Sequence, residues 1–360
     1  MSKAKWLKIL LVIPLVFVLV FTNLYQDPAN IYHDLSKEIA SAMMAGNSVY
    51  AGNNPNEREV RRQQIMMMPE EVDCVAVGPS VVLCVDKEVT GTDSFYNLGE
   101  SGANIYDIMA QLAIMDIYGK KTGRVIICVD PNSLDEVVYT APGQRSANLM
   151  PYTYYMLDLI DGKTPGPVDE SKNDKIMQLI EQSFSTTYFQ ASRDQIVSNG
   201  RYNMSGLRWG IVDDNDLSRS HYNSDGSWTY AADFQANNAE SVAAHAAQYY
   251  IEGQFACGRH LSDYSKGLFE KLIAYLVSEG VDVELFLCPL APSLWDRLEK
   301  EDEYFILDDT TVFAEELCEK YEIKLTGSYD PYELGLSDSD FYDSRHMRKE
   351  LMGVYFDFTE

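Results

Sequence analysis

The chain has 360 residues, which suits one large domain or two modest ones. It carries 55 acidic residues against 29 lysines and arginines, which gives a formal net charge of −26 at pH 7. This acidic excess excludes nucleic acid as an expected partner, because phosphate recognition needs a basic surface. It also argues against broad contact with a polyphosphate polymer, except through a local basic patch.

The N-terminus combines lysines with an apolar run that covers residues 9–21. Three lysines precede the run, namely Lys3, Lys5 and Lys8. By length alone the run suits the core of a cleaved signal peptide or a buried helix as well as a membrane anchor. No small-x-small cleavage pattern follows it, and Trp6 and Tyr25 flank it as interfacial aromatics, which favours the anchor.

We therefore predict a single transmembrane anchor at residues 1–25. A helix from Trp6 to Tyr25 would reach roughly 30 Å, about the thickness of one hydrocarbon core. Because the lysines precede the span, the positive-inside rule places residues 26–360 outside the cytoplasm. The expected localisation is the cell membrane, with a single pass and the remaining domain extracytoplasmic.

Residues 26–71 are polar and mostly helical in pattern, and we interpret them as a stalk and lead-in. Five apolar runs bounded by turn residues follow, and each predicts a buried strand. They cover residues 72–78, 94–99, 124–130, 281–290 and 322–328. Helical periodicity occupies residues 103–119, 262–279 and 308–320. This alternation predicts an α/β domain at residues 72–357, built on a doubly wound, parallel five-stranded sheet.

The third and fourth predicted strands are separated by about 150 residues, too many for a structureless connection. Within this segment, residues 140–260 are rich in Tyr, Asn, Ser, Asp and Gln. We therefore predict a large cap insertion at about 140–260 on the α/β domain.

Neither a metal nor a cofactor is expected. The six cysteines show no spacing typical of a disulfide framework or a zinc site. Cys74, Cys128 and Cys288 lie in apolar runs, which indicates small core residues. Three histidines also lack metal-ligand spacing, namely His221, His245 and His260. They are interpreted as surface or structural residues.

Polar residues and a glycine directly follow the carboxyl ends of the predicted strands. Ser80 follows the first strand in a Gly-Pro-Ser turn, Gly102 follows the second, and Asn132 follows the third. Asp343 and His346 follow the last strand near the C-terminus. In open parallel sheets, chemistry collects at the carboxyl ends of the strands. With strand order 2-1-3-4-5, the second and third strands would flank the first, and their loops would converge around Ser80.

These residues are the components of an acyl-transfer site. A serine hydroxyl such as that of Ser80 is a weak nucleophile and needs a base, which His346 would supply. Asp343 would fix the tautomer of the imidazole and stabilise its charged form. The oxyanion needs preorganised donors, and the backbone N–H groups of Ser80 and Gly102 and the amide of Asn132 would supply them.

In these features the chain resembles the SGNH/GDSL-type hydrolases. That family has a serine after strand one, a glycine after strand two, an asparagine after strand three, and a D-x-x-H element near the C-terminus. The wider layout resembles membrane-anchored SGNH-like proteins of cell-envelope polymer acylation, of the teichoic-acid D-alanylation and alginate O-acetylation type. The matching stretches are "VDCVAVGPS", "FYNLGESGANIYD", "LCPLAP" and "DFYDSRHMR". The resemblance implies a flavodoxin-like strand order 2-1-3-4-5 and catalysis by Ser80, His346 and Asp343.

The expected function is a membrane-anchored serine esterase or O-acyltransferase. Its expected partners are an acyl donor, an envelope glycopolymer and, by the resemblance, a multi-spanning membrane acyltransferase. The sequence leaves open whether water or a sugar hydroxyl accepts the acyl group. Gly-Pro-Ser stands in place of the common Gly-Asp-Ser, and "DPNS" in place of Gly-x-Asn-Asp. These departures leave a non-catalytic polymer-binding or assembly factor as the alternative.

Several arginines are weaker candidates for substrate binding. Arg345 and Arg348 lie close to the proposed base and would contact a negatively charged acceptor, or else pair with the acidic surface. A second group consists of Arg58, Arg61 and Arg62. These arginines would hold a substrate anion or, more simply, form a solvated helix face.

Overall fold

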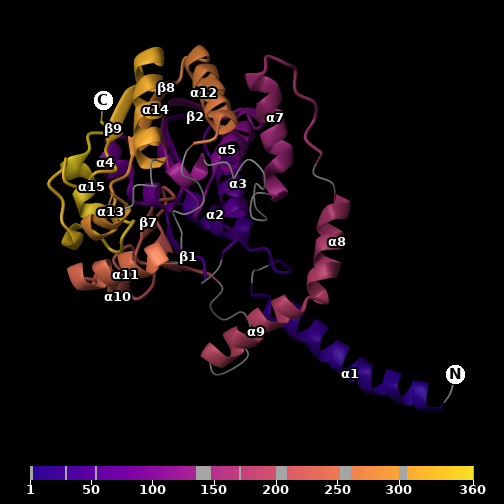
Figure 1. Ribbon diagram of the computed structural model, residues 1–360. Helices are drawn as coiled ribbons and strands as arrows, with labels where there is room; N and C mark the ends of the chain where they lie inside the picture. The colour runs from indigo at the N-terminus through magenta and orange to yellow at the C-terminus, as the bar shows by residue number, and fades with distance from the viewer. Residues whose placement is uncertain are drawn as a thin grey trace.

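The computed structural model in Figure 1 describes residues 3–28, 31–52, 55–134, 147–169, 172–199, 209–251, 261–299 and 306–359. A five-stranded parallel sheet lies at its centre, which confirms the predicted α/β architecture. The strands are β2 (Glu71–Val77), β3 (Phe95–Asn97), β4 (Lys121–Cys128), β8 (Asp282–Leu287) and β9 (Lys324–Gly327). They lie in the order β3-β2-β4-β8-β9, which reads 2-1-3-4-5 when these five are counted along the chain.

The central strand β2 shows why the sheet is covered on both faces. Val75 and Val77 belong to one hydrophobic core, whereas Cys74 and Ala76 belong to the other. Successive side chains of a strand point to opposite faces, so four consecutive apolar positions need cover on both sides. Cys74, Cys128 and Cys288 are all buried with free thiols, as the sequence predicted.

Helices supply this cover. Those of the first core include α5 (Ile105–Ile117), α7 (Met150–Ile160), α12 (Asp263–Ser278) and α14 (Ile306–Tyr321). The second core includes side chains of η1 (Ser80–Cys84), α15 (Lys349–Tyr355) and the aromatic pair Phe356 and Phe358. The predicted helices at 103–119, 262–279 and 308–320 are thus confirmed as α5, α12 and α14, with small shifts at their ends.

The start of α5 is fixed by its own sequence. Asn104 is the N-cap, and its Oδ1 accepts the backbone N–H of Tyr106 at 2.9 Å. The Asp107 carboxylate accepts the backbone N–H of Asn104 in return, which completes a capping box. The helix therefore begins directly after the loop that follows β3, and this loop carries Gly102.

A second, antiparallel sheet was not predicted. It has the order β5-β1-β6-β7. Its strands are β1 (Ser48–Tyr50), β5 (Gly210–Val212), β6 (His221–Tyr222) and β7 (Trp228–Thr229). It joins residues of the expected lead-in to residues of the expected cap, because β1 pairs with both β5 and β6.

The segment 26–71 is accordingly part of the folded body in the structure. Its helices are α2 (Ser36–Met44) and α3 (Glu57–Met67). Ile39, Met43 and Val60 from these helices share a small core with Val49 and Tyr222 of the second sheet. The helices expected in this segment are present as α2 and α3, but they do not stand apart as a stalk, because Ile39, Met43 and Val60 are buried against the rest of the chain.

The segment 140–260 contributes to several regions, and residues 140–146, 170–171, 200–208 and 252–260 of it lie outside the described part. Its helix α7 packs on α5 in the main core, and its strands build the second sheet. Its other helices are α8 (Lys172–Ser183), α9 (Thr186–Asn199), α10 (Ala232–Gln235) and α11 (Ala239–Ile251). The remaining elements are α4 (Lys87–Thr90), η2 (Pro131–Ser133), η3 (Ala147–Leu149), α13 (Pro292–Glu299) and η4 (Asp338–Asp340).

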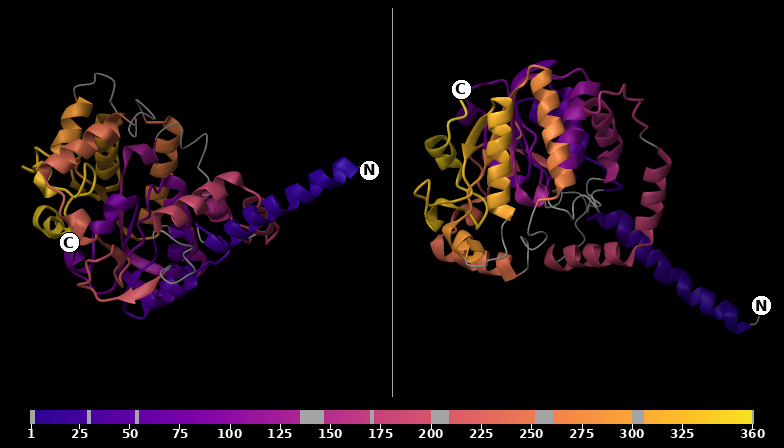
Figure 2. Two further views of the ribbon diagram at one scale, coloured as in Figure 1. Left: turned by 90° about the horizontal axis from the view of Figure 1, so that it is seen from below. Right: turned by 45° about the horizontal axis from the view of Figure 1, so that its top comes forward.

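The N-terminal helix α1 (Lys3–Gln26) projects away from the body, as Figures 1 and 2 show from three directions. Its C-terminal end is attached to α8 and α9. The amide of Asn23 donates to the carbonyls of Gln182, Ser183 and Ser185 at 3.0, 3.1 and 3.0 Å. Among the residues that the structure describes, no helix has the length and apolarity needed to cross a membrane.

Candidate active site

The turn after β2 places Ser80 at the carboxyl edge of the parallel sheet. Gly78 has φ +136°, and a Cβ on it would lie 2.9 Å from both Cβ and the carbonyl oxygen of Cys128. Only glycine therefore permits the end of β2 to approach the end of β4 this closely. Ser80 then opens the short helix η1 as a half-buried residue.

The structure brings Ser80, His346 and Asp343 together. The Ser80 Oγ lies 2.9 Å from the Nε2 of His346. The Nδ1 of the same imidazole lies 2.9 Å from Oδ2 and 3.0 Å from Oδ1 of Asp343. The three side chains thus form one continuous hydrogen-bonded chain, with the hydroxyl and the carboxylate on opposite nitrogens of the ring. This is the geometry that the sequence-based hypothesis requires.

The Asp343 carboxylate is held in its charged form. Burial alone would raise the pKa of Asp343, but the His346 imidazole and the backbone N–H groups of Arg345 and His346 outweigh it and hold that pKa well below its usual range. Both backbone groups donate to Oδ1 at 2.8 Å. A charged carboxylate at Nδ1 favours the tautomer that carries its proton there, which leaves Nε2 to accept the proton of Ser80.

Backbone contacts fix the loop that carries the histidine. Phe341 and Met347 form an isolated antiparallel bridge, and the N–H of Tyr342 donates to the carbonyl of His346 at 2.8 Å. The loop is also joined to the segment that follows β8, because the N–H of Ala291 donates to the carbonyl of Ser344 at 3.1 Å. Residues 341–347 therefore form a tight hairpin that is attached to the connection between β8 and α13.

The two arginines of this loop hold protein groups. Arg345 forms an ion pair with Asp130 and donates to the hydroxyl of Tyr249 at 3.0 Å. Burial alone would lower the pKa of Arg345, but the Asp130 carboxylate more than offsets it and raises that pKa. Arg348 donates to three carbonyls, those of Ser339, Gln235 and Asn237. Both arginines therefore fix the position of the histidine loop. Their guanidinium groups bind protein atoms in this structure, where the sequence had suggested a substrate.

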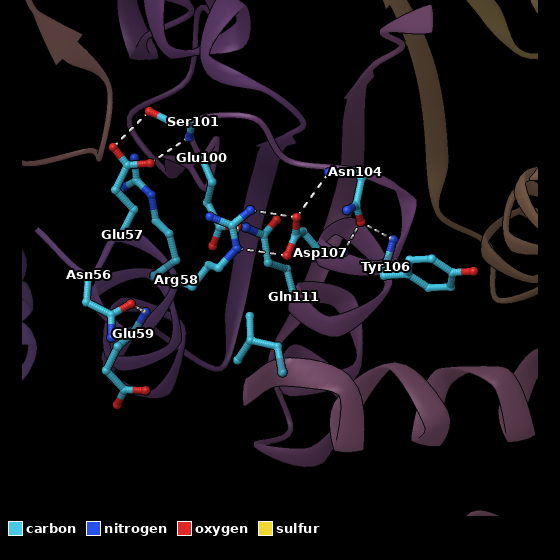
Figure 3. A network of polar contacts seen from close by, with 12 residues as sticks. Asn56, Glu57, Arg58, Glu59, Glu100, Ser101, Asn104, Tyr106, Asp107 and Gln111 are labelled. Atoms are coloured by element: carbon cyan, nitrogen blue, oxygen red, sulfur yellow. Dashed lines mark hydrogen bonds and ion pairs between the residues drawn. The ribbon is translucent and has the colours of Figure 1, made fainter. Parts of the chain in front are cut away.

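The loop after β3 carries the candidate oxyanion donor Gly102, which has φ +60°. Figure 3 shows how α3 holds this loop. The Glu57 carboxylate accepts the N–H of Ser101 at 2.6 Å and its hydroxyl at 2.9 Å. The N–H of Glu100 donates to the carbonyl of Gly78 at 3.0 Å, which joins the loop to the turn that carries Ser80.

Arg58 and Arg61 complete this support from buried positions. Arg58 forms a two-point ion pair with Asp107, at 3.0 and 2.7 Å, as Figure 3 shows. Arg61 is fully buried, and its Nε donates to the carbonyl of Gly99 at 2.9 Å. The expectation of a solvated helix face is wrong for these two residues, because their guanidinium groups bind the loop after β3. Arg62 pairs with Glu59 on the same helix at 2.9 Å.

Glu100 adds a carboxyl group to this buried cluster. Burial, followed by the nearby Asp107 carboxylate, raises the pKa of Glu100 to about 8. Arg58 opposes the shift only in part, because its Nε lies 3.8 Å from the Glu100 Oε2. This shift favours the neutral form of Glu100, beside the ion pair of Arg58 and Asp107.

Asn132 lies at the carboxyl end of β4, as predicted, within η2. Its side-chain Nδ2 donates to Oδ1 of Asp130 at 3.0 Å, and its backbone N–H donates to the same oxygen at 2.9 Å. The amide thus lies beside the Asp130–Arg345 ion pair, which links the loops after β4 and β9.

Sequence reasoning did not connect three residues with the site, namely Asp130, Tyr230 and His245, although it had interpreted His245 as surface or structural. Asp130 was passed over although it directly follows the β4 run, and it pairs with Arg345. Tyr230 stacks edge-on against the His346 ring, with 5.9 Å between the ring centroids. His245 accepts the backbone N–H of Ser344 at 3.2 Å through Nδ1. Tyr230 and His245 come from the segment 140–260, where no local pattern indicated proximity to the loop that carries His346.

A scan against protein-family models finds no match for this chain, and a search of curated proteins finds none similar to it. The roles of the residues are therefore inferred from their arrangement in this chain.

Proposed function

We propose that this protein is an SGNH-type serine acyl-transfer enzyme, an esterase or O-acyltransferase that acts on a cell-envelope glycopolymer. The observation that supports this proposal best is the chain of contacts from Ser80 through His346 to Asp343, with both key separations at 2.9 Å. The parallel sheet order and the position of Ser80 after β2 agree with the layout of that class. Neither a metal nor a cofactor takes part in the proposed reaction.

In the first half-reaction, Ser80 Oγ attacks the carbonyl carbon of an ester while His346 Nε2 takes the hydroxyl proton. The Asp343 carboxylate stabilises the imidazolium that forms. The tetrahedral intermediate then collapses, and the imidazolium gives its proton to the leaving oxygen. An acyl group remains on Ser80.

In the second half-reaction, His346 removes a proton from the acceptor hydroxyl, which attacks the acyl-serine. Collapse of this second intermediate returns the proton to Ser80 and releases the new ester, or an acid if the acceptor is water. The backbone N–H groups of Ser80 and Gly102 and the amide of Asn132 are the proposed oxyanion donors in both steps.

We also propose attachment to the cell membrane through α1, with residues 26–360 outside the cytoplasm. Several large apolar side chains of α1 are exposed, including Val12, Leu15, Phe17, Val18 and Phe21. A lipid environment would remove this apolar surface from water. A multi-spanning membrane acyltransferase would be the natural source of acyl groups at such a location.

The test is burst labelling with a small ester. The full-length protein, purified in detergent, is mixed with p-nitrophenyl acetate, and acetyl-Ser80 is identified by peptide mass spectrometry. We expect a burst of about one equivalent per protein, which Ser80→Ala abolishes. If the wild type forms no acyl-enzyme and Ser80→Ala still restores polymer modification in a deletion strain, the acyl-transfer proposal fails and a polymer-binding factor takes its place.

A further inference from the structure

A cavity of about 430 Å³ lies beside the proposed catalytic histidine. One part of its wall is aromatic, formed by Trp228, Tyr230 and Tyr342. Another part is charged and includes Asp86, Glu88, Lys349 and Glu350. The cavity therefore combines flat apolar surfaces with several hydrogen-bond acceptors.

The aromatic wall is continuous with the catalytic machinery. The Tyr230 ring lies 5.9 Å from the His346 ring and 5.0 Å from the Tyr342 ring, between centroids. Trp228 continues the series, 6.4 Å from Tyr230. A ligand in the cavity would thus be separated from the proposed base by a single aromatic side chain.

The charge of the wall is negative. The ammonium of Lys349 lies 2.8 Å from Oδ2 of Asp86, so these two charges balance each other. The carboxylates of Glu88 and Glu350 remain, and both residues are exposed. Glu350 accepts the hydroxyl of Tyr342 at 3.1 Å, which directs that carboxylate to the aromatic wall. An anionic ligand would meet like charges here, whereas hydroxyl and ammonium groups would meet acceptors.

We infer that this cavity is a subsite for the acceptor glycan and binds a pyranose unit next to the one that is acylated, because Tyr230 separates the cavity from His346. The unit it takes belongs to a glycan without anionic groups, with an amino sugar as the best fit. The aromatic rings would stack on the apolar face of the sugar, and the carboxylates would accept from its hydroxyl or ammonium groups. This inference rests on the proposed acyl transfer and narrows its acceptor. It differs from what the resemblance implies, because alginate is a polyuronate and teichoic acid a polyphosphate.

The test compares three oligosaccharides that differ in charge. Tetramers of glucosamine, N-acetylglucosamine and mannuronate are titrated by calorimetry into the full-length protein in detergent, at one ionic strength. We expect the first two to bind and mannuronate to bind at least about tenfold more weakly. Trp228→Ala should weaken glucosamine binding about tenfold, whereas Tyr154→Ala, at an exposed tyrosine of α7, should leave it unchanged.

A second variant, which changes only charge, tests the inference even if Trp228→Ala misfolds. Glu88 and Glu350 are exposed, so Glu88→Gln combined with Glu350→Gln should fold normally. It should reduce the preference for glucosamine over N-acetylglucosamine, and Glu315→Gln on the exposed face of α14 should not. Equal or tighter binding of mannuronate, or no binding of any tetramer, would overturn the inference.

The burst assay separates this inference from the proposed function. A normal acetyl-Ser80 burst with no charge selectivity among the tetramers contradicts only the assignment of the cavity. Selective glycan binding without any acyl-enzyme contradicts the acyl-transfer proposal instead.

Discussion

The hydrogen bond between Ser80 and His346 depends on other residues. The Asp343 carboxylate accepts hydrogen bonds from two backbone N–H groups of its own loop and from the Nδ1–H of His346, so it fixes both the loop and the ring. Gly78 supplies the close approach to Cys128 that sets the position of Ser80. At the scale of single residues, Asp343 therefore fixes the imidazole of His346, and Gly78 fixes the position of the serine that contacts it.

Ser80→Ala and His346→Ala should each reduce the rate of acyl-enzyme formation about a thousandfold or more, and the double variant should be no worse than either one. The serine and the imidazole act as a unit, so loss of one member removes the contribution of both. Asp343→Asn should reduce the rate less. Stopped-flow burst kinetics with p-nitrophenyl acetate measures this, and Ser278→Ala, at an exposed serine, is the control. Strict additivity of the two single losses would show that the pair does not act as a unit.

Asp343 should also contribute to stability in a pH-dependent way. Its pKa is lowered in the folded state, so its contribution is present above the unfolded value of about 3.9 and is lost as pH falls below it. The difference in unfolding free energy between wild type and Asp343→Asn should therefore shrink by about 1 kcal/mol between pH 7 and pH 3. Urea titrations at the two pH values measure the difference. A gap that stays constant or widens in acid would contradict the lowered pKa.

At the scale of elements, α3 determines the position of the loop after β3. Its arginines and Glu57 bind Gly99, Ser101 and the first turn of α5. Helix α3 lies in the segment before the α/β sheet, so residues that precede the sheet in sequence support the proposed oxyanion loop. The sequence pattern of α3 alone did not indicate this, because charged residues at helical spacing are usually solvated.

Arg61→Met should lower the free energy of unfolding by about 2–4 kcal/mol, because it leaves buried carbonyls without their donor. The carbonyls affected are those of Gly99 and Gly226. Arg193→Met, at an exposed position of α9, should change the same free energy by no more than about 0.5 kcal/mol. Chemical denaturation of both variants is the measurement. A neutral effect of Arg61→Met would show that water or neighbouring groups satisfy these carbonyls.

At the scale of the whole molecule, α1 is separated from the sheet but joined to α8 and α9 (Figures 1 and 2). The hydroxyl of Tyr188 donates to Asp27 at 2.6 Å, next to the contacts of Asn23. The base of the helix is therefore fixed to the body, while its exposed apolar side chains extend beyond it. If α1 attaches to a membrane, as proposed, it would hold the body at a short distance from the bilayer.

Full-length protein should remain in the membrane pellet after carbonate extraction, and a variant that lacks residues 1–22 should be released. Protease added to intact cells should digest the chain beyond about Tyr25, because the positive-inside rule, applied to the lysines before the apolar run, predicts that the body lies outside. A cytoplasmic protein serves as the control for cell integrity. Complete protection of the body in intact cells would show that the orientation is wrong.

The sequence determined the parallel sheet and its main helices, because buried strands and amphipathic helices have periodic patterns that are local. It also indicated Ser80, His346 and Asp343, since residues that follow parallel strands must meet at one edge. The antiparallel sheet was not predictable in this way. Its strands are two or three residues long, and β1 pairs with partners more than 150 residues away, as in Val49 with Tyr222.

Only the tertiary structure decided what lies around these residues. Tyr230 against His346, Arg61 on Gly99 and Asp130 with Arg345 are contacts between segments that are distant in the chain. Each depends on how the loops and the second sheet pack. Local periodicity reports whether a residue faces a core, but it carries no information on which distant segment forms the opposite wall.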